Sequence, residues 1–285
     1  MAKNNKPSLK RNIDYDKKNT SFNIPQFDLK TVSPIPRKNT FVIIVIITLL
    51  LIMILTVNTS EEKVNKTTNN TSEAEKIVST NSQIGNSTLG YVYKEGPYGN
   101  TSSDVKIAYI LGVHPREKGA HQLMEQALKE KENNLQYCYY IYRVNVTENP
   151  TDFSASRYNG QLLANQFIVP DAINNNFTFT IDSHYSNGAW GVERFVFTPN
   201  EDNTLSNQIG HALSDNFDWM TYYTPTNPSS PEYVTGPLND GGVAAIIYEA
   251  YTEDNKNVTL EHDRQLVDFI DKWNFSGSVS NNTTE

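Results

Sequence analysis

Cysteine is nearly absent from this sequence. The 285 residues include a single one, Cys138. A lone cysteine excludes an internal disulfide bond, which is unusual for a domain that faces an oxidising environment. An exposed domain in this chain therefore points to an anaerobic setting.

Positive charge is also scarce outside the N-terminal segment. The net charge is −8 for the whole chain, while residues 1–38 carry nine Lys or Arg and three Asp or Glu. That segment is +6, which leaves −14 for residues 39–285. An acidic domain repels phosphate backbones, so we expect no nucleic-acid partner. The sequence indicates no protein partner either.

Charge is missing altogether from Asn39 to Ser60, and the apolar run 41–57 within it also lacks Gly and Pro. A helix needs roughly 17–25 such residues to cross the hydrocarbon core of a bilayer, and in lipid its backbone must satisfy its own hydrogen bonds. We therefore predict one transmembrane helix over residues 39–58. A cleaved signal peptide is the alternative, but the run exceeds the usual roughly 7–15 residues and no small-x-small cleavage site follows.

The flanks of this helix predict its orientation. The basic segment 1–38 is expected to be a cytoplasmic tail, which puts the C-terminal domain outside the cell. Asn-x-Ser/Thr acceptor patterns agree, because twelve follow the helix and only Asn19 precedes it. Chance in an Asn- and Thr-rich sequence explains about half of them. The twelve are Asn58, Asn65, Asn69, Asn70, Asn86, Asn100, Asn145, Asn176, Asn257, Asn274, Asn281 and Asn282. We expect a single-pass glycoprotein of the cell membrane, in an anaerobic microbe such as an archaeon.

Composition divides the rest of the chain. Residues 59–88 are rich in Asn, Thr, Ser, Glu and Lys and poor in large apolar side chains, so they are predicted to form a flexible, glycosylatable stalk. Residues 277–285 are predicted to be a disordered tail. Residues 89–276 remain, enough for one domain with a sizeable core.

Strand-like and helix-like runs alternate in this domain. Apolar runs of strand length occupy 105–113, 135–146, 177–181, 192–197 and 243–248, and helical spacing occupies 119–131, 205–217 and 260–275. This alternation predicts an α/β fold: a single three-layer α/β/α domain with a mostly parallel or mixed sheet.

Chemically active side chains follow several of the predicted strands. His114 and Glu117 follow the first run, His184 follows the third, and Glu249 follows the last. Open α/β sheets bind ligands at the carboxyl ends of their strands, so these residues are expected to converge. Two imidazoles and one carboxylate form a common catalytic zinc set that leaves a fourth position for water.

Nearby residues suit the rest of a hydrolytic reaction. Glu249 could carry a proton from water to a leaving amine. Arg116 or Arg157 could hold the negative charge of the reacting group or of a substrate carboxylate. His121 stands four residues after Glu117 and could join it in a helical metal pair, but we expect His121 on an exposed or half-exposed helix face.

The motifs His114-Pro-Arg-Glu117, Ile181-Asp-Ser-His-Tyr-Ser186 and Ile246-Ile-Tyr-Glu249 occur in this order. The set resembles the zinc carboxypeptidase family, which includes carboxypeptidase A-like enzymes and the succinylglutamate desuccinylase–aspartoacylase-like relatives that deacylate acyl-amino acids. The resemblance extends over roughly residues 100–275. It implies that His114, Glu117 and His184 bind Zn²⁺, that Glu249 is the general base, and that Arg116 lies on the substrate side.

The sequence departs from this family at one motif. The family carries an Asp-x-Asn-Arg motif that grips the terminal carboxylate of the substrate, whereas here Asn165 is present and no arginine follows it. Gln does not replace a bidentate arginine, which argues against strict C-terminal exopeptidase specificity. The resemblance further implies substrate-binding roles for Asn165 and for Tyr233, which stands where the family has a mobile tyrosine.

The sequence as a whole predicts a membrane-anchored, extracellular, zinc-dependent hydrolase that cleaves an amide bond in a peptide or an acyl-amino acid. Cell-wall peptides are a candidate substrate. The alternatives are a catalytically inactive carboxypeptidase-like surface binding module, favoured by the missing arginine, and a structural envelope protein without metal. In the last case His114 would be an ordinary turn residue, and Glu117 would be an ordinary carboxylate in the first turn of a helix, where the helix dipole favours it.

Overall fold

The computed structural model describes residues 79–199, 204–226 and 228–275. The predicted cytoplasmic tail, the predicted transmembrane helix at 39–58, most of the predicted stalk and the predicted tail at 277–285 lie outside these residues. Within the described ranges, no helix has the length and apolar character needed to cross a membrane.

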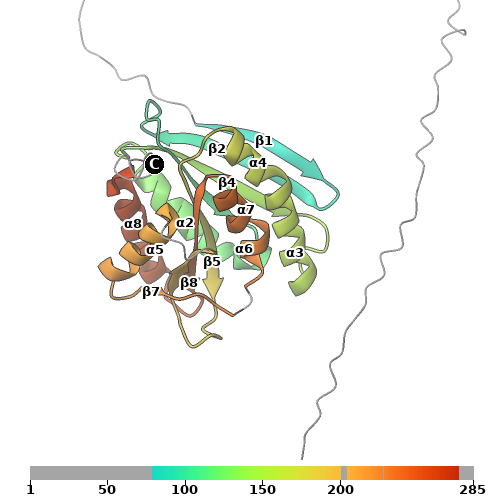
Figure 1. The fold of residues 1–285 in the computed structure, drawn as a ribbon. Helices are drawn as coiled ribbons and strands as arrows, with labels where there is room; N and C mark the ends of the chain where they lie inside the picture. Colours follow the sequence, from blue (N-terminus) through green and yellow to red (C-terminus); the bar gives the residue numbers. More distant parts are fainter. Residues whose placement is uncertain (1–78, 200–203, 227, 276–285) are drawn as a thin grey trace, which may run out of the picture. The chain divides into compact units, whose positions relative to one another are not determined.

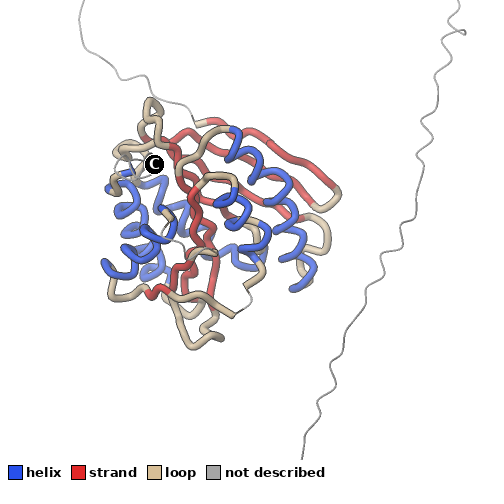
Figure 2. Tube along the Cα trace, viewed as in Figure 1, coloured by secondary structure: helices blue, strands red, loops and turns tan. Residues whose placement is uncertain are grey.

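One mixed sheet of eight strands forms the centre of the domain, in the order β1-β2-β4-β3-β5-β8-β6-β7 (Figures 1 and 2). The strands are β1 (Thr80–Ser87), β2 (Gly90–Gly99), β3 (Lys106–Leu111), β4 (Cys138–Val146), β5 (Phe179–Ser186), β6 (Phe195–Phe197), β7 (Thr221–Tyr222) and β8 (Ala244–Tyr251). The central strands β4, β3, β5 and β8 run parallel, whereas β1–β2, β2–β4 and β6–β8 are antiparallel pairs.

Helices cover both faces of this sheet (Figure 1). On one face lie α2 (Lys118–Glu130), α5 (Leu205–Asn216) and α8 (Lys256–Lys272). On the other lie α3 (Phe153–Leu163), the π-helical turn η3 (Ala164–Ile168), α4 (Val169–Asn174), α6 (Ser230–Tyr233) and α7 (Thr235–Asp240). The predicted α/β class and mixed sheet are confirmed.

Strand β3 shows why the sequence forms these layers. Ile107, Tyr109 and Leu111 pack into the core on the α2 side, while Ala108 and Ile110 pack into the core on the α3 side. All five are fully buried. A strand that is apolar on both faces suits the interior of a parallel sheet covered by helices.

The domain begins earlier than the predicted boundary at residue 89. Residues 80–87, assigned from composition to the stalk, form β1 and pair with β2. Strand β2 was not predicted from the sequence. Most side chains of β1 are exposed or half-buried, so its sequence is polar and resembles a linker. The fourth predicted strand is also shorter, because β6 covers only Phe195–Phe197.

The chain reverses its direction across the sheet between β3 and β5. It passes from β3 outward through α2 to β4, and returns through α3 to β5 on the other side of β3. Such a switch point opens a crevice at the carboxyl ends of the two strands, because the flanking connections lie on opposite faces.

Candidate metal centre

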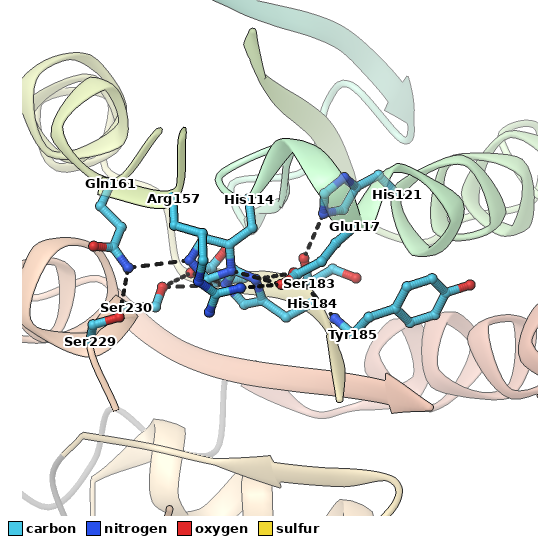
Figure 3. Close-up of polar contacts among 11 residues, drawn as sticks. His114, Glu117, His121, Arg157, Gln161, Ser183, His184, Tyr185, Ser229 and Ser230 are labelled. Atoms are coloured by element: carbon cyan, nitrogen blue, oxygen red, sulfur yellow. Dashed lines mark hydrogen bonds and ion pairs between the residues drawn. The ribbon is translucent and has the colours of Figure 1, made fainter. Parts of the chain in front are cut away.

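The residues at this switch point form one compact cluster (Figure 3). His114 Nδ1 lies 3.1 Å from Glu117 Oε1, and His184 Nδ1 lies 2.8 Å from Glu117 Oε2. The two imidazole rings have centroids 4.2 Å apart. One ligand atom from each of the three residues lies within 4.8 Å of the others, and all three side chains are buried.

Local structure brings these side chains together. His114 follows β3 in extended backbone conformation, and Pro115 begins the short 3-10 helix η2 (Pro115–Glu117), whose last residue is Glu117. His184 lies near the carboxyl end of β5, which pairs with β3. The backbone amide of Tyr185 also donates to Glu117 Oε2 at 3.3 Å.

The donor set fits a divalent metal such as zinc. Two imidazole nitrogens and a carboxylate are ligands that zinc prefers, and the inward atoms of both rings are the Nδ1 atoms. The outward Nε2 atoms also have partners: His184 Nε2 lies 2.9 Å from Asp182 Oδ2, and His114 Nε2 lies 3.2 Å from Gln161 Nε2. Metal-binding histidines typically donate their second N–H to an acceptor such as a carboxylate, and the Asp182 carboxylate is in place to serve His184 in this way.

The pKa values of the cluster are strongly shifted. Burial lowers the pKa of His114 to about 4, and the neighbouring His184 adds to this effect. Burial also disfavours a charged His184, but Asp182 and Glu117 outweigh it and hold the pKa of His184 well above its usual value. Burial would raise the pKa of Glu117, yet His114 and His184 keep it well below its usual value.

Glu249 lies beside this cluster on β8. Its register partner on β5 is His184, so both side chains leave the sheet on the same face. Burial raises the pKa of Glu249 to about 8, with His184 opposing and Glu117 reinforcing the shift. The carboxyl can therefore both accept and release a proton near neutral pH.

Two arginines lie at the edge of the cluster. Arg157 Nη1 is 2.6 Å from Glu117 Oε1, so the guanidinium fixes the carboxylate. Arg116 is exposed, and its guanidinium carbon lies 5.5 Å from the centroid of the Phe153 ring. The guanidinium carbon of Arg157 lies 5.3 Å from the centroid of the same ring, so the Phe153 ring is close to both cations.

The other predicted substrate residues lie on the α3 and α6 side. Asn165 Nδ2 donates to the backbone oxygen of Tyr233 at 2.8 Å. The Tyr233 ring meets the edge of Tyr158, with centroids 5.7 Å apart. The expectation for His121 is wrong: its side chain is buried and its Nε2 lies 3.2 Å from the Ser183 backbone oxygen, because α2 packs this face against β5.

The residues that contact the outer nitrogens of the two histidines were not predicted from the sequence. Asp182 precedes His184 by two residues and so leaves β5 on the same face. Ser230 donates to Asp182 Oδ2 at 2.8 Å. Gln161 follows Arg157 by one helical turn of α3, and this i, i+4 spacing is the signal that could have revealed it.

Gly160 explains how α3 reaches the cluster. A Cβ atom at Gly160 would lie 1.9 Å from the Val113 backbone oxygen. Only glycine allows the helix to approach the end of β3 this closely. The approach puts Arg157 and Gln161 within reach of Glu117 and His114 (Figure 3).

No family model and no curated protein matches the chain. Among solved structures, it is similar to a metallo-carboxypeptidase from Burkholderia cenocepacia, with 11% identity, a TM-score of 0.44, and coverage of 68% of this chain and 64% of that chain. It is also similar to a metallo-carboxypeptidase from Pseudomonas aeruginosa in complex with (2-guanidinoethylmercapto)succinic acid. The identity is 13%, the TM-score is 0.43, and the match covers 64% of this chain and 60% of that chain. For the product-bound cell shape determinant protein Csd4 from Helicobacter pylori the identity is 7% and the TM-score is 0.44. That match covers 63% of this chain and 53% of that chain. The chain thus spans less than two thirds of each of these three chains, and similarities of this size assign neither a family nor an activity to it.

Proposed function

We propose that the domain is a metal-dependent hydrolase, with zinc as its ion, that cleaves an amide bond in a peptide or an acyl-amino acid. The observation that carries the proposal is the convergence of His114 Nδ1, His184 Nδ1 and the Glu117 carboxylate in a buried cluster. When bound, an ion of this kind supplies a Lewis acid that polarises a carbonyl group and lowers the pKa of a coordinated water.

Glu249 is the proton carrier in this proposal. Its carboxyl is next to His184 across the strand pair, and its pKa of about 8 lies close to neutral pH. Glu249 takes a proton from the attacking water and delivers it to the amine that leaves.

The two arginines bind different negatively charged groups in this proposal. Arg157 fastens Glu117 in place and keeps a cation beside the reacting group. Among the described residues Arg116 has no acidic partner, so its guanidinium is available to a substrate carboxylate. Asn165 and Tyr233 contact each other on the side of α3 and α6, and we assign them to substrate contacts there.

We further infer that the enzyme works outside the cell, held there by the predicted helix at 39–58. The basic tail before that helix and the acceptor patterns for glycosylation after it support this orientation. Protease added to intact cells should remove the domain. A domain that is degraded only after the cells are opened would contradict the orientation.

Turnover by the purified full chain tests the hydrolase. The zinc-loaded protein is offered short peptides, cell-wall peptides and N-acyl amino acids, and released amine is measured. We expect hydrolysis that a chelator abolishes and added zinc restores. Glu232→Gln, an exposed change on α6, is the matched control for variants of Glu249. Hydrolysis that persists without metal would contradict the mechanism, whereas bound zinc with no turnover on any substrate would favour the binding module.

A further inference from the structure

The two histidines of the candidate metal centre are supported by different chemical groups. His184 Nε2 faces the Asp182 carboxylate at 2.9 Å, whereas His114 Nε2 faces the amide nitrogen of Gln161 at 3.2 Å. The same amide nitrogen donates to Ser229 Oγ at 3.0 Å. Gln161 is only 2% exposed, so its orientation is determined by these contacts rather than by bulk water.

This contact determines where His114 carries its proton. When the Gln161 amide nitrogen donates to Nε2, the ring proton is on Nδ1, which donates to Glu117 Oε1 at 3.1 Å. Coordination of a metal at Nδ1 requires the other tautomer, with the proton on Nε2. That proton then needs an acceptor, and the Gln161 side chain has one in its Oε1.

A half-turn of the amide supplies this acceptor. Rotation about the last side-chain bond of Gln161 exchanges its oxygen and nitrogen without displacing helix α3. The Ser229 hydroxyl can follow the change, because a hydroxyl both donates and accepts. In the rotated form Gln161 Oε1 accepts from His114 Nε2, and Nδ1 is free to bind an ion.

We propose that Gln161 is a positioning residue that sets the tautomer of His114 and thereby controls metal binding. The inference rests on the proposed function, since the ion is the one assigned there. With the amide oxygen towards Nε2 the centre is competent for metal, and with the amide nitrogen towards Nε2 it is not. Gln161 acts only through His114 and makes no contact with the reacting atoms.

Because the Gln161 side chain is uncharged, it also affects how tightly the ion is held. The buried cluster already contains the carboxylates of Glu117 and Asp182, with Arg157 as the guanidinium bound to Glu117. A carboxylate at position 161 would make His114 a more basic ligand and add negative charge around the ion. The amide provides the acceptor without that charge, so the ion is held less tightly and remains a stronger Lewis acid.

Zinc affinity of the full chain tests the proposal at one fixed pH. The metal-free protein competes for zinc with a chromophoric chelator, and cobalt(II) absorption reports the ligand geometry. Gln161→Met has a similar length but lacks a strong hydrogen-bond acceptor, so the zinc affinity of this variant should fall by roughly 10–100-fold. Gln161→Glu keeps an acceptor and should bind zinc at least as tightly as the wild type, with a lower kcat. Gln126→Met, an exposed change on α2, is the control and should match the wild type.

The outcomes separate this inference from the proposed function. Wild-type protein that binds zinc, together with a Gln161→Met variant of equal affinity and an unchanged cobalt spectrum, would overturn the role of Gln161 alone. Weak binding by both Gln161→Met and Gln161→Glu would also overturn it, because a proton acceptor should restore the site. A wild type that binds no zinc would overturn the metal centre and this inference with it.

Discussion

Glu249 and His184 are register partners on the adjacent parallel strands β8 and β5, and their side chains leave the sheet on the same face. His184 in turn lies 2.8 Å from Glu117. The relative position of a proposed metal ligand and the proposed proton carrier is therefore fixed by backbone pairing. Sites supported on strands hold their geometry more accurately than sites on loops.

Substitution of Glu249 by glutamine tests the proton transfer. The variant keeps the shape of the side chain but cannot titrate, so kcat should fall by roughly 10²–10⁴-fold. Zinc content should not change, because Glu249 is not one of the three proposed ligands. Both kcat and zinc content are measured on the same preparation of the variant, with Glu232→Gln as the control. Wild-type turnover in Glu249→Gln would exclude the proposed role.

Asp182 should matter for metal affinity rather than for proton transfer. Asp182→Asn weakens the negative partner of His184 Nε2, so zinc should bind roughly 10–100-fold more weakly. Competition with a chelator measures the change, and Asp240→Asn, an exposed substitution on α7, serves as the control. Equal affinity of Asp182→Asn and wild type would show that this carboxylate does not support the centre.

Gly160 should be intolerant of a methyl group. In Gly160→Ala the new Cβ would meet the Val113 backbone oxygen at 1.9 Å, so α3 has to move away from β3. We expect a loss of roughly 1–3 kcal/mol in the free energy of unfolding, measured with denaturant, and weaker zinc binding. Ser154→Ala, on the exposed side of the same helix, should change neither quantity. Wild-type stability in Gly160→Ala would contradict the close approach of α3.

Asp263 should make the free energy of unfolding depend on pH. It lies on the buried side of α8, and neither carboxyl oxygen has a hydrogen-bond partner among the described residues. Burial raises the pKa of Asp263 well above its usual value, and the adjacent Tyr248 hydroxyl only partly offsets this. Between the unfolded and the folded pKa the folded state holds more protons, so the free energy of unfolding falls as pH rises.

The variant Asp263→Asn removes this titration. It should be more stable than the wild type at neutral pH by about 1 kcal/mol or more, and the difference should shrink as the pH is lowered towards about 4. Unfolding with denaturant at several pH values measures both effects, with the exposed Asp215→Asn as the control. A difference that stays constant with pH would show that Asp263 does not titrate on folding.

The central strands could be predicted from the sequence, because strands such as β3 are apolar on both faces and the helices between them have a clear apolar side. Strands β1 and β2 could not. Most of the β1 side chains stay exposed or half-buried even after pairing, so its composition carries the signal of a linker. The buried position of His121 was missed for a related reason, since it depends on the packing of α2 on β5.

Some residues of the candidate site could likewise be predicted from the sequence, and others could not. His114, Glu117, His184 and Glu249 follow apolar runs directly, and the carboxyl ends of parallel strands bring them together. The i, i+4 spacing from Arg157 puts Gln161 on the same face of α3, but its contact with His114 depends on the close approach of α3 to β3 at Gly160. Only the structure shows that tertiary contact.

Metal stoichiometry of the full chain tests the central claim most directly. Elemental analysis compares the wild type with a His114→Ala, His184→Ala double variant and with a His211→Ala, His262→Ala control, whose histidines stack on Tyr222 and Trp219 instead. The account predicts about one zinc per chain in the wild type and in the control, and none in the His114→Ala, His184→Ala protein. No zinc in the wild type, after purification without chelator and with zinc added back, would contradict it.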